Sequence, residues 1–336
     1  MRQNALTVIE LCAGVGGQAL GLEQAGFCVT AVVDADADTC RTLSTNRPEW
    51  HPICDDLRRM EPVEHPSLDH ADVLSCGLPR SPYSEAGKQL GDADSRDALQ
   101  ATLDMASWVR PRALLLENIP TFLRAPKFEK QRRAVRDAAE DLGYEVVSTV
   151  LDATDFGVPQ RRKHAFLVAM RPEDLSRFSW PLPTSTRCPT LGETLRASMA
   201  ARGWPEADKW AADASEPAPL IMGGATGRGG ADLGATRAKK LWARQGVYGG
   251  SIGDAVPDRD FRLDRTGALR DGLPRLTVDQ VSLLQSMPED WRIYGKKTSA
   301  YRQVSQATPP PVARAVGLRI AAALRESDSP GIRRDL

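Results

Sequence analysis

Residues Leu6–Phe27 read LTVIELCAGVGGQALGLEQAGF, and this stretch decides the fold class. It opens with a β-branched apolar run that is typical of a buried strand. Gly14, Gly16 and Gly17 follow, and closely spaced glycines between a strand and a helix predict a tight turn. The residues after the turn predict an amphipathic helix that ends at Gly26.

The same alternation of apolar runs and helical patterns continues to residue 170. The apolar runs cover residues 29–34, 71–77, 112–119, 145–153 and 162–170. Helical patterns lie between them, around Asp97–Val109 and Lys127–Leu142. Because the runs are apolar throughout, we expect an α/β fold with a mostly parallel, Rossmann-like sheet that is covered on both faces.

The character of the chain changes after residue 183. Residues 201–274 are rich in Gly, Arg, Asp and Trp with weak periodicity, and helical patterns return after them. The last pattern starts at TPPPVARAVG (308–317), where the prolines fall in the first turn of a helix. We predict a sheet domain over 1–183, a small loop-rich lobe over 184–275, returning helices over 276–325 and a flexible tail over 326–336.

Composition limits the class of protein. A hydrophobic content of 41% and a charged content of 26% are ordinary for a globular domain. No apolar run approaches the ~20 residues that a membrane span needs, and the first residues lack the form of a signal peptide, so we expect a cytoplasmic protein with no membrane partner. The six cysteines show no CxxC pairing, which indicates reduced thiols and no metal site. With a formal net charge of zero, any surface for nucleic acid must be a local patch.

Two acidic residues stand at the ends of predicted strands: Asp34 closes the run 29–34, and Asp56 ends a short third strand that precedes the run 71–77. Asp34 stands 20 residues after Gly14, where a carboxylate that accepts a ribose hydroxyl is expected. Asp56, in the stretch CDDL, is placed to accept from an adenine amino group. Each alone could equally be a solvated residue at a strand end. Together with the glycine turn they favour a cofactor that contains adenosine.

Four stretches occur in a recognisable order: ELCAGVGGQALG (10–21), LLLENIP (114–120), FGVPQRRKHAFLV (156–168) and YRQVSQATPPPVA (301–313). With this set the chain resembles the DNA cytosine-5 methyltransferases over nearly its whole length. The resemblance implies a domain that binds S-adenosylmethionine (SAM), a target-recognition lobe, and a cytosine flipped out of double-stranded DNA. It also implies that the returning helices complete the SAM-binding domain beside the glycine turn. The residues expected at SAM, or at its product S-adenosylhomocysteine (SAH), are Cys12, Gly14, Gly16, Gly17, Asp34, Asp56, Ser305 and Gln306.

The chemistry of the family explains its residue types. A thiolate adds to C6 of cytosine while a glutamic acid at N3 stabilises the charge pushed into the ring, and C5 then attacks the SAM methyl group. Glu117 and Asn118 match the family's Glu-Asn pair, and Gln160 and Arg162 match the first two polar residues of a Gln-x-Arg-x-Arg segment. The expected catalytic set is Arg80, Glu117, Asn118, Gln160, Arg162 and His164.

Arg80 is the main departure from the family. The loop SCGLPRSPY (75–83) places it where the family has its nucleophilic cysteine. A guanidinium stays protonated and has no lone pair for attack, so Arg80 cannot replace a thiolate. Its charge must avoid the SAM sulfonium, or turn toward a phosphate or Glu117. Cys76 precedes Arg80 by four residues and is interpreted as a small buried residue.

Two further departures accompany Arg80. His164 stands at the last Arg of the Gln-x-Arg-x-Arg segment, and Ser305-Gln306 replaces the usual Gly-Asn. The interpretation we favour is a homologue that binds SAM and double-stranded DNA but is silent or altered in C5 methylation. C5 methylation by another route, N4 methylation through Ser81-Pro82-Tyr83, other base chemistry and an RNA substrate remain open. The expected partners are double-stranded DNA and a restriction endonuclease or an active methyltransferase.

Contacts to DNA are expected from the loop 84–96 and from the second lobe. Basic residues cluster around Trp242 in TRAKKLWARQ (236–245), which suits contacts to phosphates; the alternative is a solvated helix with Trp242 in the core. The expected DNA-binding residues are Ser84, Lys88, Gln89, Arg96, Arg237, Lys239, Lys240 and Arg244. The target sequence does not follow from the chain.

Overall fold

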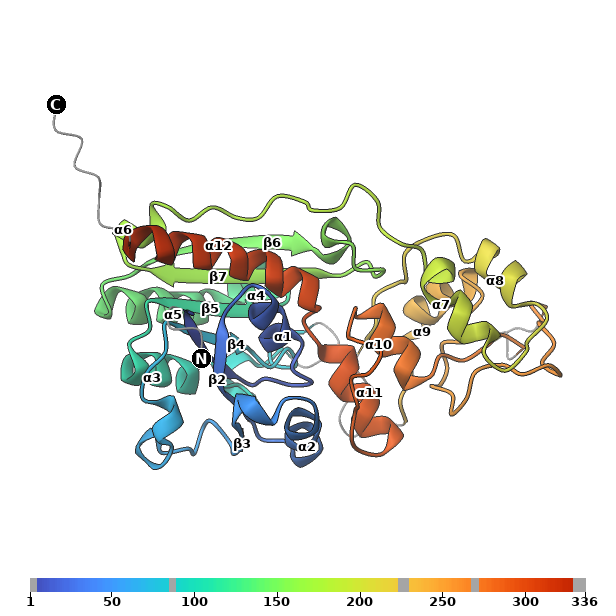
Figure 1. Cartoon of the computed structure of the whole chain (residues 1–336), viewed down its shortest axis with the longest axis horizontal. Helices are drawn as coiled ribbons and strands as arrows, with labels where there is room; N and C mark the ends of the chain where they lie inside the picture. Colours follow the sequence, from blue (N-terminus) through green and yellow to red (C-terminus); the bar gives the residue numbers. More distant parts are fainter. Residues whose placement is uncertain (1–4, 85–88, 223–229, 267–271, 329–336) are drawn as a thin grey trace.

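The computed structural model describes residues 5–84, 89–222, 230–266 and 272–328 (Figure 1). Its central feature is a seven-stranded sheet in the order β3-β2-β1-β4-β5-β7-β6. The strands are β1 (Thr7–Leu11), β2 (Cys28–Asp34), β3 (Pro52–Cys54), β4 (Val73–Gly77), β5 (Ala113–Asn118), β6 (Glu145–Asp152) and β7 (Lys163–Met170). The first five are parallel to one another, whereas β7 pairs antiparallel with both β5 and β6. The mostly parallel, Rossmann-like sheet is therefore confirmed, and its antiparallel edge is a feature that apolar runs do not reveal.

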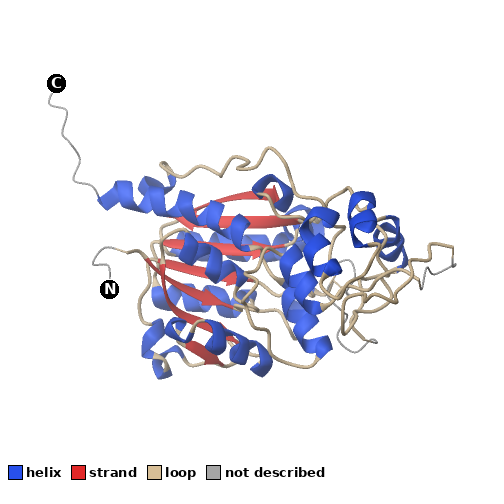
Figure 2. Ribbon diagram, turned by 45° about the vertical axis from the view of Figure 1, so that its right-hand side comes forward, coloured by secondary structure: helices blue, strands red, loops and turns tan. Residues whose placement is uncertain are grey.

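Helices occupy the connections and both faces of the sheet (Figure 2). The α-helices are α1 (Gly17–Gln24), α2 (Ala37–Asn46), α3 (Leu99–Val109), α4 (Pro120–Arg124), α5 (Glu129–Asp141), α6 (Pro172–Leu175), α7 (Leu191–Ala200), α8 (Ala207–Asp213), α9 (Thr236–Arg244), α10 (Val278–Leu284), α11 (Lys297–Gln306) and α12 (Pro310–Asp328). Short 3-10 helices are η1 (Pro48–Trp50), η2 (Pro62–Glu64), η3 (Pro66–Leu68), η4 (Gly91–Ala93), η5 (Pro126–Phe128) and η6 (Ala153–Phe156). Since α12 continues to Asp328, the predicted tail begins too early; residues 329–336 lie outside the described part.

The sheet separates two hydrophobic cores. Because side chains alternate along a strand, Val8 of β1 packs into the core beneath α1 and α12, and Ile9 packs into the core beneath α3 and α5. Both residues are fully buried, as is Val33 of β2 on the second side. Coverage of both faces explains why the strands are apolar throughout.

Helix α1 is buried along most of its length, so the prediction of an amphipathic helix is wrong. Residues 17–22 are all buried. The helix α12 covers the side that would otherwise face water, and a Cβ on Gly21 would lie 2.4 Å from the Pro310 oxygen. The two helices therefore contact backbone to backbone, and the returning helix does lie against the helix that follows the glycine turn.

The second lobe contains α7, α8 and α9, which lie beyond α10 and α11 from the sheet (Figure 1). Its core is aromatic: Trp204 packs edge-on against Phe261, and Trp210 donates to the Gly246 carbonyl at 2.9 Å. Trp242 is fully buried, which supports the core interpretation of this side chain. No helix within the described ranges is both long and apolar enough to cross a membrane.

Candidate functional site

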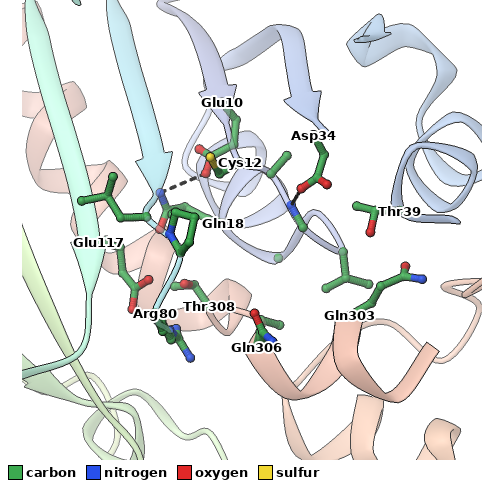
Figure 3. A pocket seen from close by; sticks show the side chains of 18 of the residues that line it. Glu10, Cys12, Gln18, Asp34, Thr39, Arg80, Glu117, Gln303, Gln306 and Thr308 are labelled. Atoms are coloured by element: carbon green, nitrogen blue, oxygen red, sulfur yellow. Dashed lines mark hydrogen bonds and ion pairs between the residues drawn. The ribbon is translucent and has the colours of Figure 1, made fainter. Parts of the chain in front are cut away.

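A cavity of about 210 Å³ opens where the parallel strands end at their carboxyl termini (Figure 3). In sheets of this kind, ligands bind at that edge. The walls come from the glycine turn, the ends of β1, β2, β4 and β5, and the α11–α12 connection. The lining residues are Glu10, Cys12, Ala13, Gly14, Val15, Gly17, Gln18, Asp34, Asp36, Thr39, Gly77, Leu78, Pro79, Arg80, Glu117, Arg302, Gln303, Gln306, Ala307 and Thr308.

Asp34 is held at one end of the cavity by backbone donors. The Gly14 N–H donates to one carboxylate oxygen at 2.8 Å, and the Asp36 N–H donates to the other at 2.9 Å. Burial raises the pKa of Asp34, and these backbone donors partly oppose that effect. Gly14 adopts a φ of +55°, which a glycine accepts without strain. The carboxylate is thus fixed where it can accept hydroxyl groups of a ligand.

Glu10 and Gln18 lie beneath the glycine turn and present polar atoms without partners. The Gln18 side-chain amide donates to Glu10 at 3.1 Å and to the Ser75 hydroxyl at 2.8 Å. Glu10 Oε2 and Gln18 Oε1 are buried and have no partner. Burial raises the pKa of Glu10 to about 8, so this group is neutral near pH 7. Unpartnered polar atoms in a cavity wall indicate a polar ligand, and oxygen acceptors fit SAM, which carries hydroxyl and amino donors.

Five of the residues expected at the cofactor line the cavity: Cys12, Gly14, Gly17, Asp34 and Gln306. The other three lie outside its lining: Gly16, Asp56 and Ser305. A Cβ on Gly16 would lie 2.9 Å from Leu43, so this glycine permits close packing.

Asp56 and Ser305, the other two residues outside the cavity lining, bond other groups of the protein. The Asp56 carboxylate accepts from the Arg58 guanidinium at 2.8 Å, two residues after β3 ends. Ser305 is buried, and its carbonyl accepts from Arg162 at 2.7 Å. Both residues therefore bond other parts of the protein outside the cavity.

Several lining residues were missed from the sequence. They are Glu10, Gln18, Asp36, Thr39, Arg302, Gln303 and Thr308. Glu10 and Gln18 lie inside the first motif, so their polar character in a buried stretch was an available signal. Arg302 and Gln303 lie inside the fourth motif, but their place beside α2 depends on long-range packing: the Thr42 hydroxyl donates to Gln303 at 2.8 Å, and Arg302 bonds Asp36 at 2.9 Å.

Arg80 and Glu117 lie at the other end of the cavity from Asp34 and Thr39 (Figure 3), and His164, outside the cavity lining, contacts Glu117. Arg80 Nη2 donates to Glu117 Oε1 at 2.9 Å, and His164 Nδ1 lies 2.7 Å from the same oxygen. Because a carboxylate oxygen accepts, Nδ1 carries the imidazole proton. The 3.4 Å approach of Arg80 Nη2 to Nδ1 is then a contact and no hydrogen bond. Of the orientations expected for Arg80, the structure has the one toward Glu117.

The charges in this cluster follow from burial and from the ion pair. Burial raises the pKa of Glu117, but Arg80 and His164 outweigh that effect and hold the pKa below its usual value. Burial lowers the pKa of His164, which Glu117 only partly opposes. The cluster therefore contains a carboxylate, a guanidinium and a neutral imidazole. Arg80 Nη1 is buried and has no partner, so one donor of the guanidinium is available to a ligand.

The remaining expected catalytic residues do not line the cavity. Gln160 donates to Gln285 at 2.8 Å and accepts from the Ile221 N–H at 3.2 Å. Arg162 donates to the Ser305 carbonyl and is 7% exposed. Asn118 accepts from the next backbone N–H and leaves its amide nitrogen without a partner. The contacts of Gln160 and Arg162 join the sheet domain to the second lobe and to α10 and α11.

Cys76 and Tyr83 are both in the core. Cys76 is fully buried beside Thr102, as expected for a small core residue. The Tyr83 ring is fully buried and packs edge-on against Phe122, and its hydroxyl donates to Asp97 at 2.7 Å. The aromatic ring that N4 methylation would require for stacking is therefore part of the hydrophobic core.

Some of the expected DNA-binding residues bond acidic or polar side chains of the protein, and others are exposed cations on α9. Arg96 bonds the Asp94 carboxylate at 2.7 Å, and Lys239 bonds Asp232 at 2.9 Å. The Gln89 side chain accepts from Lys127, and Ser84 also interacts with another group of the protein. Lys88 lies outside the described residues. The exposed cations of α9 share one face at helical spacing: Arg237, Lys240 and Arg244.

Comparison with known proteins fits this geometry. The model of the C-5 cytosine-specific DNA methylases matches residues 6–322. The type II methyltransferase M.NaeI of Lentzea aerocolonigenes is 43% identical over 95% of this chain and 76% of its own length. M.NgoMIV of Neisseria gonorrhoeae is 37% identical over 96% and 99%. The Entamoeba histolytica methyltransferase EhMeth has the same fold, with a TM-score of 0.64 at 13% identity over 98% of this chain and all of that one. The chain belongs to the C-5 cytosine-specific DNA methylase family, whose methyl donor is SAM.

Proposed function

We propose that this protein binds SAM or SAH together with double-stranded DNA, holds a flipped cytosine next to Glu117, and does not methylate its C5. One observation carries the proposal: the Arg80 guanidinium lies 2.9 Å from Glu117, and the Arg80 side chain is 12% exposed. The resemblance of the loop 75–83 to the family's catalytic loop is what matches Arg80 to the nucleophile position. An ion pair thus occupies the place where the family's reaction needs a thiolate beside a carboxylic acid.

The ion pair removes two requirements of C5 methylation at once. The first is a nucleophile at C6, because a guanidinium cannot form that bond. The second is a proton on Glu117, because only the acid form donates to N3 of cytosine. Arg80 holds the pKa of Glu117 below its usual value and so favours the carboxylate. Restoring activity therefore requires more than a thiol: the neighbouring charge must also be lost.

Binding functions have separate support. The cavity keeps the glycine turn and Asp34 in hydrogen-bonded contact, and its wall contains unpartnered polar atoms. The exposed cations of α9 stand on the second lobe, where they can meet phosphates. Both groups of residues are separate from Arg80 along the chain. A homologue can therefore bind cofactor and DNA without C5 chemistry. Since M.NaeI and M.NgoMIV are type II methyltransferases, the partner we propose is a restriction endonuclease or an active methyltransferase.

A second candidate is C5 methylation with another nucleophile. Cys12 favours it, because this residue lines the cavity that contains Glu117. In this version the Cys12 thiolate would add to C6, and Arg80 would neutralise the charge that develops on the ring. Replacement of Cys12 by serine would then abolish methyl transfer while SAM binding, measured separately, is retained.

Transfer of a labelled methyl group from SAM to a mixed-sequence duplex tests the proposal. We expect no label from the native protein and a C5 label, identified by mass spectrometry, from Arg80→Cys. Adding Glu117→Gln to the active variant should remove the signal. Label from the native protein would refute the silent interpretation, and its loss in Cys12→Ser would establish the second candidate.

A further inference from the structure

We infer that Arg80 makes this cavity prefer SAH over SAM. The inference rests on the proposed binding function and adds a ligand preference to it. The two molecules differ at sulfur: SAM carries a methyl group and a positive charge there, whereas SAH is a neutral thioether. A positive charge in the wall of the same cavity therefore distinguishes them by electrostatics alone.

The geometry places this charge inside the cofactor cavity. Arg80 and Glu117 line the same continuous cavity as Gly14 and Asp34. Figure 3 shows Arg80 and Glu117 on the opposite side from Asp34 and Thr39. With adenosine held at the Asp34 end, the remainder of the cofactor extends toward the Arg80 end. Arg80 is 12% exposed on its side chain, so water screens its charge only weakly.

Arg80 weakens SAM binding wherever the sulfur lies between the Glu117 carboxylate and the Arg80 guanidinium. A Glu117 carboxylate without a partner would attract the SAM sulfonium. Arg80 neutralises that carboxylate, and it repels the sulfonium wherever the sulfur is nearer to the guanidinium. Either way Arg80 weakens SAM binding, while the neutral sulfur of SAH is little affected. Glu10 does not compensate, because burial keeps it protonated near pH 7.

Isothermal titration of the native protein and of charge variants with SAM, SAH and sinefungin tests the inference. Sinefungin carries a protonated amine in place of the sulfonium, so it should follow SAM. We expect the native protein to bind SAH more tightly. Arg80→Met should raise the ratio of SAM affinity to SAH affinity by about five-fold or more, and Glu117→Gln should lower it, because the guanidinium then has no counter-charge. Arg133→Met removes an exposed charge from α5 and should leave the ratio unchanged.

The outcomes separate this inference from the proposed function. Opposite shifts in Arg80→Met and Glu117→Gln would support the ligand preference. Equal affinities in the native protein, or a ratio that does not move in Arg80→Met, would overturn the preference while leaving cofactor binding intact. Failure of the native protein to bind any of the three ligands would overturn both. Arg80→Met keeps an unbranched side chain and removes the charged end, so its ratio alone can overturn the preference if Glu117→Gln does not fold.

Discussion

Arg80 and Glu117 come from the carboxyl ends of two adjacent parallel strands and meet at 2.9 Å. In the sheet, Gly77 of β4 lies beside Glu117 of β5, so a residue that follows β4 by three positions is brought directly to the glutamate. In the function proposed above, this is the position of the family's nucleophilic cysteine. Arginine there forms an ion pair with Glu117, and we propose that it removes the nucleophile, holds Glu117 as a carboxylate and weakens SAM binding.

The ion pair should also affect stability. Glu117→Gln leaves the guanidinium in a buried site without its counter-charge, and we expect it to lower the free energy of unfolding by about 3 kcal/mol. Adding Arg80→Met to that variant should recover part of the loss, because neither charge is then buried alone. Urea unfolding of the two single variants and the double variant measures the coupling. The exposed pair Arg133–Asp137 serves as the control and should contribute no more than about 0.5 kcal/mol. Purely additive losses at Arg80 and Glu117 would argue against the pair.

Glu10 should make stability depend on pH. Its folded pKa of about 8 lies above the ordinary value of 4.5, so the unfolded chain loses this proton first as pH rises. The protonated Glu10 carboxyl group makes its full contribution to the free energy of unfolding below pH 4.5. This contribution is lost as pH rises through 8. Glu10→Gln, which cannot ionise, should therefore gain at least ~1 kcal/mol over the native protein between pH 5 and pH 8.5. Thermal unfolding at both pH values measures this difference. A difference that is constant with pH would show that Glu10 is ionised in the folded protein.

The sheet and the helices that cover it were predictable because they leave local signals. Apolar runs and the glycine turn identify the strands and α1, whose predicted end at Gly26 lies two residues beyond the observed one at Gln24. The burial of α1 was not predictable, since the covering helix α12 lies almost three hundred residues later. The antiparallel direction of β7 was equally hidden, because an apolar strand reads the same in both directions.

The candidate site was predictable only where single residues carry the chemistry. Arg80, Glu117 and His164 were identified from motifs and are brought together by the structure. Gln160 and Arg162 follow the same motifs, yet their side chains bond backbone and amide groups outside the cavity. A motif specifies which residues occur, whereas the direction of a side chain depends on partners that are distant in sequence.

The exposed face of α9 should contribute to DNA binding through phosphates. Replacing Arg237, Lys240 and Arg244 together by alanine should weaken binding to all duplex sequences alike. If each cation contacts one phosphate, the slope of log affinity against log salt should fall by about 2.7. Fluorescence anisotropy at several salt concentrations gives the slope. The matched control removes three cations of α5, Lys130, Arg133 and Arg136, each already paired with an acidic residue. An unchanged slope in the α9 variant would place the DNA elsewhere on the protein.

The contact between α1 and α12 should tolerate no side chain at Gly21. In an isolated helix, Gly21→Ala would be favourable by about 1 kcal/mol. Here the new Cβ would lie 2.4 Å from the Pro310 oxygen and 2.6 Å from the Ala313 Cβ, so α12 must move away. We expect the free energy of unfolding to fall by ~1–3 kcal/mol. SAM and SAH binding should weaken as well, because Thr308 and Gln306 of the cavity wall precede α12 directly. Gln24→Ala, at an exposed position of the same helix, should change neither quantity. If Gly21→Ala instead stabilised the protein, helix propensity would outweigh the clash and the two helices could separate without cost to the cofactor site.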